Sequence, residues 1–179
     1  RLLNKKEVSL SSDIVVITDS SGPIALGGVM GGEATSVANS TRSIFLESAF
    51  FPPAAIAGRA RRLNLTSDAA YRFERGVDFG STQYAIERAT QLIVDVCGGT
   101  VGPVTVAQST LPARDAILVR PARVERVLGI KILSAELSVI LVKLGCSCTP
   151  SDQDFLVKPP SYRFDLSIEP DFIEEVARV

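Results

Sequence analysis

Residues 116–129, AILVRPARVERVLG, contain local signals for a strand, a helix and a helix end. The β-branched and aliphatic start of this stretch, 116–119, predicts a strand. Pro121 then suits the first turn of a helix, and Gly129 suits its end because glycine tolerates the left-handed conformation found there. A strand followed at once by a short helix is therefore expected.

The residues that follow continue this pattern. Residues 134–144 predict a second helix with one apolar side, closed by a glycine. Short strands are expected near 146–149 and 155–158, and a last helix from about Pro170. This helix–helix–strand–strand order favours a small winged-helix-like domain over 113–179.

The first part of the chain, residues 1–112, also mixes strands and helices. Strands are predicted at 12–19, 24–26 and 43–49, and helices at 52–62 and 67–76, followed by an amphipathic core helix that ends at Gly98. A segment rich in Gly, Pro, Thr and Ser places the domain boundary near Pro112. The expected fold class is mixed α+β in two small domains.

Composition excludes several classes of function. The chain has 179 residues, 46% of them hydrophobic, and a formal charge of −1, so no bulk basic field marks it as a nucleic-acid binder. It lacks an apolar run long enough for a bilayer, and the expected location is the cytoplasm. It has no histidine, which excludes Ser-His-Asp and Cys-His catalysis, and its three cysteines have no zinc spacing.

Two segments could lie close to a ligand. Residues 27–32, GGVMGG, hold four glycines in six positions and allow close backbone approach, although a tight loop between strands explains them as well. Ser67 stands where a helix begins, so its hydroxyl and the nearby amides could bind a carbonyl, ribose or phosphate. Plain helix capping is the alternative for this position.

Charged side chains form two further groups. Five arginines could contact RNA phosphate locally, or form a solvated or salt-bridged helix surface: Arg59, Arg61, Arg62, Arg72 and Arg75. Four carboxylates could together bind Mg²⁺: Asp165, Asp171, Glu174 and Glu175. As an alternative, those on the last helix could be there because the helix dipole stabilises acidic side chains near a helix start.

Taken together, the motifs resemble the β subunits of bacterial phenylalanyl-tRNA synthetases over essentially the whole chain. Four motifs are similar to the editing domain of that family: GVMGG (28–32), LESAF (46–50), ARR (60–62) and RFERGVD (72–78). Five more are similar to the domain that follows it: VRP (119–121), LG (128–129), LGC (144–146), PPSYRFD (159–165) and EEVAR (174–178).

The resemblance implies a function for each part. It implies an α₂β₂ enzyme whose α subunit, outside this chain, uses ATP to attach phenylalanine to its tRNA. The editing domain would hydrolyse tyrosine misattached to that tRNA, with Glu47 accepting the tyrosine hydroxyl. Gly28 and Gly31 would border the pocket, and Ser67 and Ala69 would line its other side.

The same resemblance assigns a metal site shared with the α subunit, in which Mg²⁺ is bound by Asp165, Asp171, Glu174 and Glu175. It also implies that the editing domain begins upstream of Arg1. The family often has Thr, Ser and His where this chain has Ser67, Ala70 and Tyr71, so the chemistry changes at two of these positions.

Two other functions remain open from the sequence. The chain could be a non-catalytic module that binds RNA or a protein partner, as its winged-helix-like second half suggests. It could also be a free-standing Mg²⁺-dependent hydrolase in which the four carboxylates are the active site.

Overall fold

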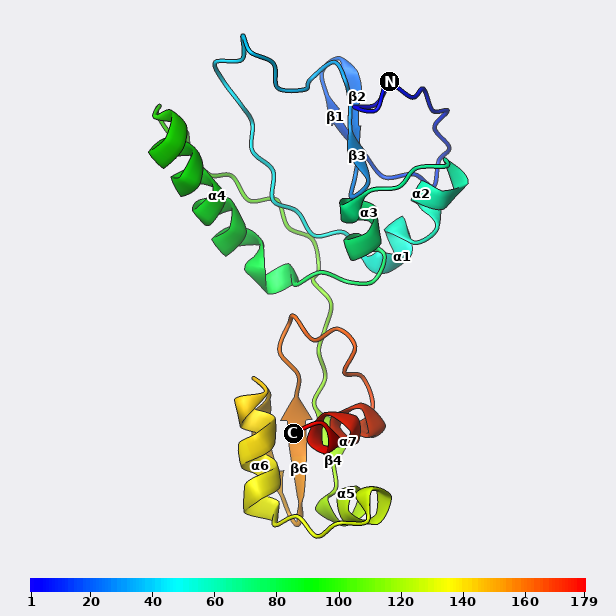
Figure 1. Ribbon diagram of the computed structural model, residues 1–179, viewed down its shortest axis with the longest axis vertical. Coiled ribbons are helices and arrows are strands. Elements are labelled where there is room, and N and C mark those ends of the chain that lie inside the picture. The colour runs from blue at the N-terminus through cyan, green and yellow to red at the C-terminus, as the bar shows by residue number, and fades with distance from the viewer. The chain divides into compact units, whose positions relative to one another are not determined.

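The computed structural model describes all residues, 1–179, and the chain divides into two compact units (Figure 1). Unit 1 is Arg1–Thr105 and unit 2 is Val106–Val179. No helix or strand forms in residues 98–116, and the boundary predicted near Pro112 lies in the same segment. None of the helices combines the length and the apolar character that a membrane crossing requires.

Unit 1 contains a small antiparallel sheet in the order β1-β2-β3. Its strands are β1 (Val16–Asp19), β2 (Gly22–Leu26) and β3 (Met30–Gly31). The turn between β2 and β3 falls in the glycine-rich segment 27–32, and its residue Val29 is buried. The sheet therefore presents this turn at one of its ends.

Five helical segments follow the sheet. They are α1 (Pro53–Ile56), α2 (Arg59–Arg62), α3 (Asp68–Phe73), the 3₁₀ turn η1 (Phe79–Ser81) and α4 (Thr82–Cys97). The single helix predicted over 52–62 is wrong, because Gly58 adopts φ +74° and separates α1 from α2. A left-handed residue cannot continue a right-handed helix.

The core of unit 1 joins the sheet to the short helices. Its buried hydrophobic side chains are Leu2, Leu26, Val29, Ile56, Ala60, Leu65 and Ala70. Phe51 packs against this cluster and meets the ring of Phe73 edge to face, with centroids 5.1 Å apart. Residues 27–32 are thus packed directly on α1 and α3.

Two further predictions for unit 1 are wrong. Residues 43–49 form no strand, and Phe45 is 91% exposed. A strand needs a neighbour to accept its ladder of hydrogen bonds, and this segment pairs with none. The predicted core helix does form as α4, but none of its side chains is buried.

Unit 2 has the predicted order of elements. It comprises β4 (Ile117–Val119), α5 (Pro121–Leu128), α6 (Ser134–Lys143), β5 (Ser147–Ser151), β6 (Asp154–Lys158) and α7 (Glu169–Ala177). The strands form one antiparallel sheet in the order β4-β6-β5. Side chains from strands and helices share its core, among them the fully buried Val119, Leu137, Val157 and Phe172. The predicted mixed α+β fold class is confirmed.

Candidate functional site

The predicted pocket of unit 1 is built around one hydroxyl. Ser67 is the N-cap of α3, and its Oγ accepts a hydrogen bond from the backbone N–H of Ala70 at 3.1 Å. The same Oγ donates to the backbone carbonyl of Val29 at 2.6 Å. Ser67 therefore caps the helix and fastens it to the turn at 27–32.

The glycines of this turn allow it to approach α1. Gly28 has φ +68°, and a Cβ there would lie 3.0 Å from side-chain carbons of both Phe51 and Ile56. At Gly31, a Cβ would lie 3.2 Å from the Leu3 side chain. The turn thus uses glycine for close packing as well as for its conformation.

The remaining predicted pocket residues, Ala69 and Glu47, have different environments. Ala69 is half-buried in the first turn of α3, next to Ser67, whereas Glu47 is exposed on the segment that forms no strand. Neighbouring Ser48 donates to the Thr82 carbonyl at 2.8 Å, which ties this segment to the start of α4. The structure therefore brings Ser67 to the glycine turn but leaves the Glu47 carboxylate in solvent.

Most of the clustered arginines of unit 1 are engaged by neighbours. Arg59 and Arg62 form ion pairs with Asp13 at 3.4 and 2.7 Å. Hydrogen bonds from Ser11 and Arg62 lower the pKa of the Asp13 carboxyl. Arg75 pairs with Glu74 and stacks 3.7 Å from the ring centroid of Tyr71.

Two arginines of this cluster, Arg61 and Arg72, are exposed and form no ion pair. They are the side chains of the cluster that stay available for an RNA phosphate. The salt-bridged helix surface left open by the sequence accounts for the others.

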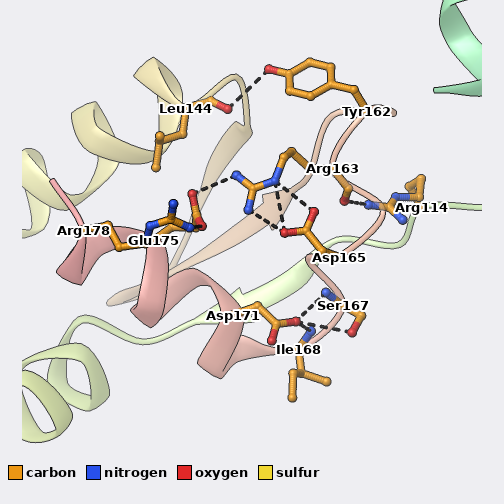
Figure 2. A network of polar contacts seen from close by, with 10 residues as sticks. All are labelled: Arg114, Leu144, Tyr162, Arg163, Asp165, Ser167, Ile168, Asp171, Glu175 and Arg178. Carbon is orange, nitrogen blue, oxygen red and sulfur yellow. Dashed lines mark hydrogen bonds and ion pairs between the residues drawn. The ribbon is translucent and has the colours of Figure 1, made fainter. Parts of the chain in front are cut away.

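In unit 2, the carboxylates predicted to bind metal have separate roles (Figure 2). Arg163 donates from Nη2 to Asp165 Oδ2 at 2.7 Å and from Nη1 to Glu175 Oε2 at 2.8 Å. The same hydrogen bonds lower the pKa values of both carboxyls. Arg178 donates to the other oxygen of Glu175 at 3.1 Å.

The other two carboxylates lie apart from this pair. Asp171 Oδ2 accepts from the backbone amides of Ser167 at 2.7 Å and Ile168 at 2.9 Å, which caps α7. Glu174 is exposed. No group of three or more His, Cys, Asp or Glu side chains is placed to hold a metal ion, so the arrangement does not fit Mg²⁺. The shared Mg²⁺ site stays a prediction.

A second buried ion pair was not foreseen from the sequence. Glu169, at the start of α7, accepts from the backbone amide of Arg120 at 2.9 Å and from its guanidinium at 2.6 Å. Arg123 adds an ion pair at 3.0 Å. The hydrogen bond from Arg120 is the main reason why the pKa of Glu169 is lowered. Acidic residues are common in first helical turns, so spacing alone gave no sign of these partners.

Comparison with known protein families gives each unit a counterpart. Residues 1–98 match the B3/4 domain, which is more than half of the chain. The chain belongs to the B3/4 domain family. Residues 117–179 match the tRNA synthetase B5 domain. The glycine turn and Ser67 thus lie in the B3/4 domain, and the Arg163 cluster lies in the B5 domain.

Curated relatives extend the match across both domains. The chain is 53% identical over 178 residues to the phenylalanine–tRNA ligase beta subunit of Thiobacillus denitrificans. It is 49% identical to that of Dechloromonas aromatica and 51% identical to that of Chromobacterium violaceum. Each match covers 99% of this chain but only 22–23% of the relative. The resemblance to β subunits is confirmed, and the chain spans less than a quarter of the length of these relatives.

Proposed function

We propose that this chain is part of the β subunit of a phenylalanine–tRNA ligase and that its B3/4 domain edits misacylated tRNA. The single observation that carries the proposal is 49–53% identity to such subunits over 99% of the chain. The proposed substrate is tyrosine attached in error to the phenylalanine tRNA. The reaction is hydrolysis of the ester that joins them.

Selection of tyrosine needs a group that recognises its hydroxyl. Glu47 is exposed, so its carboxylate is free to accept a hydrogen bond from a ligand. Bound phenylalanine would cover this carboxylate without offering it a donor, so the carboxylate would lose its water and stay unpaired. A site of this kind can discriminate by up to about 10⁴.

The backbone supplies the rest of the proposed pocket. The hydrogen bond from Ser67 to Val29 holds the glycine turn, with Gly28 and Gly31, against the start of α3 beside Ala69. Because the Ser67 hydroxyl is already engaged, its proposed role is to position the turn. Without a histidine in the chain, the proposed chemistry is attack by a positioned water, with no side-chain nucleophile.

The assembled enzyme would supply what this chain lacks. In the proposed α₂β₂ arrangement, the α subunit binds ATP and attaches phenylalanine, and the tRNA presents its acylated end to the B3/4 domain. Arg61 and Arg72 are exposed and unpaired, which supports a local contact with the tRNA backbone. The enzyme would act in the cytoplasm.

Deacylation of tyrosyl-tRNA and phenylalanyl-tRNA by the full-length enzyme tests this proposal. Glu47→Ala should lower the preference for tyrosine by about 10- to 150-fold, because a hydrogen bond to a charged group contributes about 1.5–3 kcal/mol. Glu47→Gln keeps one acceptor oxygen and should lose less. Glu7→Ala, which removes another exposed carboxylate of the same unit, is the matched control.

The outcomes separate editing from its rival. Loss of tyrosine preference in Glu47→Ala alone supports the pocket. Unchanged preference in all variants would refute the role of Glu47 and favour a non-catalytic module that binds RNA or a partner. The exposed Arg61 and Arg72 are the observation that favours this second candidate.

A further inference from the structure

Two acidic side chains near the end of unit 2, Asp165 and Glu175, meet at one arginine, Arg163 (Figure 2). All three guanidinium nitrogens of Arg163 donate to carboxylates. Nε lies 2.9 Å from Asp165 Oδ1, Nη2 lies 2.7 Å from Asp165 Oδ2, and Nη1 lies 2.8 Å from Glu175 Oε2. One guanidinium therefore bridges a carboxylate of the loop 159–168 and a carboxylate of α7.

We infer that Arg163, and no divalent cation, is the charge that holds Asp165 and Glu175 together, and that this ion-pair cluster fastens the loop 159–168 to α7. The backbone carbonyl of Arg163 also accepts a hydrogen bond from Arg114, which precedes β4. Arg163 thus connects its own loop and the adjoining α7 with a segment that lies 49 residues earlier in the chain.

Burial explains why Glu175 needs a permanent partner. Its side chain is only 10% exposed, and that of Arg163 is 20% exposed. A carboxylate withdrawn from water is strongly disfavoured without a compensating charge. A guanidinium stays charged at every physiological pH and matches the planar carboxylate geometry, so the compensation requires no bound metal.

The same geometry leaves little for Mg²⁺ to bind. Mg²⁺ requires nearly octahedral oxygen ligands at about 2.0–2.1 Å. Both oxygens of Asp165 accept from Arg163, both oxygens of Glu175 accept from arginines, and Asp171 Oδ2 accepts from two backbone amides. A divalent cation would have to displace Arg163 and lie beside Arg178, against charge repulsion. Glu174, the fourth carboxylate, is exposed and takes no part in the cluster.

Hydrogen–deuterium exchange of the full-length enzyme, with MgCl₂ or with EDTA, tests the inference. In the wild-type enzyme, peptides covering 159–168 and α7 should exchange at the same rate in both conditions. Arg163→Gln and Glu175→Gln should each speed exchange in 159–168 by about tenfold or more, since each removes hydrogen bonds between charged groups. The double variant should add little to either single one, because the two residues share one interaction.

Glu174→Gln separates the two assignments without endangering the fold, because that side chain is exposed and adjacent to Glu175. The ion-pair cluster predicts no effect of this variant in either condition. Slower exchange with MgCl₂ that is lost in Glu174→Gln would overturn the inference and support a metal site. Peptides from unit 1 report whether each variant enzyme is folded. If Arg163→Gln speeds exchange throughout unit 2 while unit 1 exchanges as in wild type, the result still supports the cluster.

Discussion

Replacing Ser67 by alanine should loosen α3 and the glycine turn together. The side chain makes two hydrogen bonds, one from the Ala70 amide and one to the Val29 carbonyl. Loss of an N-cap costs about 1 kcal/mol, and loss of a further hydrogen bond to a half-buried carbonyl costs about 1 kcal/mol. The local free energy of opening should therefore fall by about 2 kcal/mol.

This change corresponds to about 30-fold faster amide exchange, since each 1.36 kcal/mol is a factor of ten. Mass spectrometry should find the acceleration in peptides that cover 27–32 and 68–76. Peptides from α6 in unit 2 are an internal reference because the two units have separate cores. Ser67→Thr keeps the hydroxyl and should stay close to the wild-type rate.

Two results would contradict this reasoning. Exchange that stays within about twofold of wild type in Ser67→Ala would mean that the hydroxyl contributes little free energy. Acceleration in α3 alone, with 27–32 unchanged, would mean that the Val29 hydrogen bond does not hold the turn.

Other substitutions test the buried ion pair and the glycine turn. Glu169→Gln should lower the stability of unit 2 by about 2 kcal/mol, measured by denaturation against the exposed control Glu125→Gln. Folding lowers the pKa of Glu169 from 4.5, so the stability difference between wild type and Glu169→Gln should persist at neutral pH. It should shrink as the pH falls below 4.5 and the carboxylate is protonated. A stability difference that does not change with pH would exclude the ion pair as its source. Gly28→Ala should destabilise unit 1 by about 1–2 kcal/mol more than Gly58→Ala. Both glycines have positive φ, but only at Gly28 would the added Cβ lie close to other side chains. An equal loss of stability in the two variants would mean that packing is unimportant at Gly28.

The sequence predicted best those elements whose ends are determined locally. Pro121 and Gly129 delimit α5, and the Ser67 cap begins α3, as their short-range chemistry indicates. The strand predicted at 43–49 does not form, because a high strand propensity does not provide the neighbouring strand that a sheet requires. The prediction of one helix over 52–62 was wrong because Gly58, which can adopt either right-handed or left-handed conformations, adopts the left-handed one.

The candidate sites show the same division. The sequence grouped Glu174 with Glu175 by helical spacing, but burial separates them, since one is exposed and the other is bonded to Arg163. The Ser67 hydroxyl was expected at a helix start, whereas its bond to Val29 joins residues 38 positions apart. Contacts of that range depend on the packed fold, and a single sequence contains no local signal for them.

The segment that joins the two units also determines how proteases can separate them. Residues 98–113 are all exposed and have no secondary structure, which makes them accessible to cleavage. They contain neither lysine nor arginine, so trypsin has no site there, whereas an elastase-like enzyme could cut after the exposed Val104 or Val106. Limited digestion with the second kind of enzyme would yield the B3/4 and B5 domains as separate fragments. The choice of protease would then determine whether the chain is cut within residues 98–113.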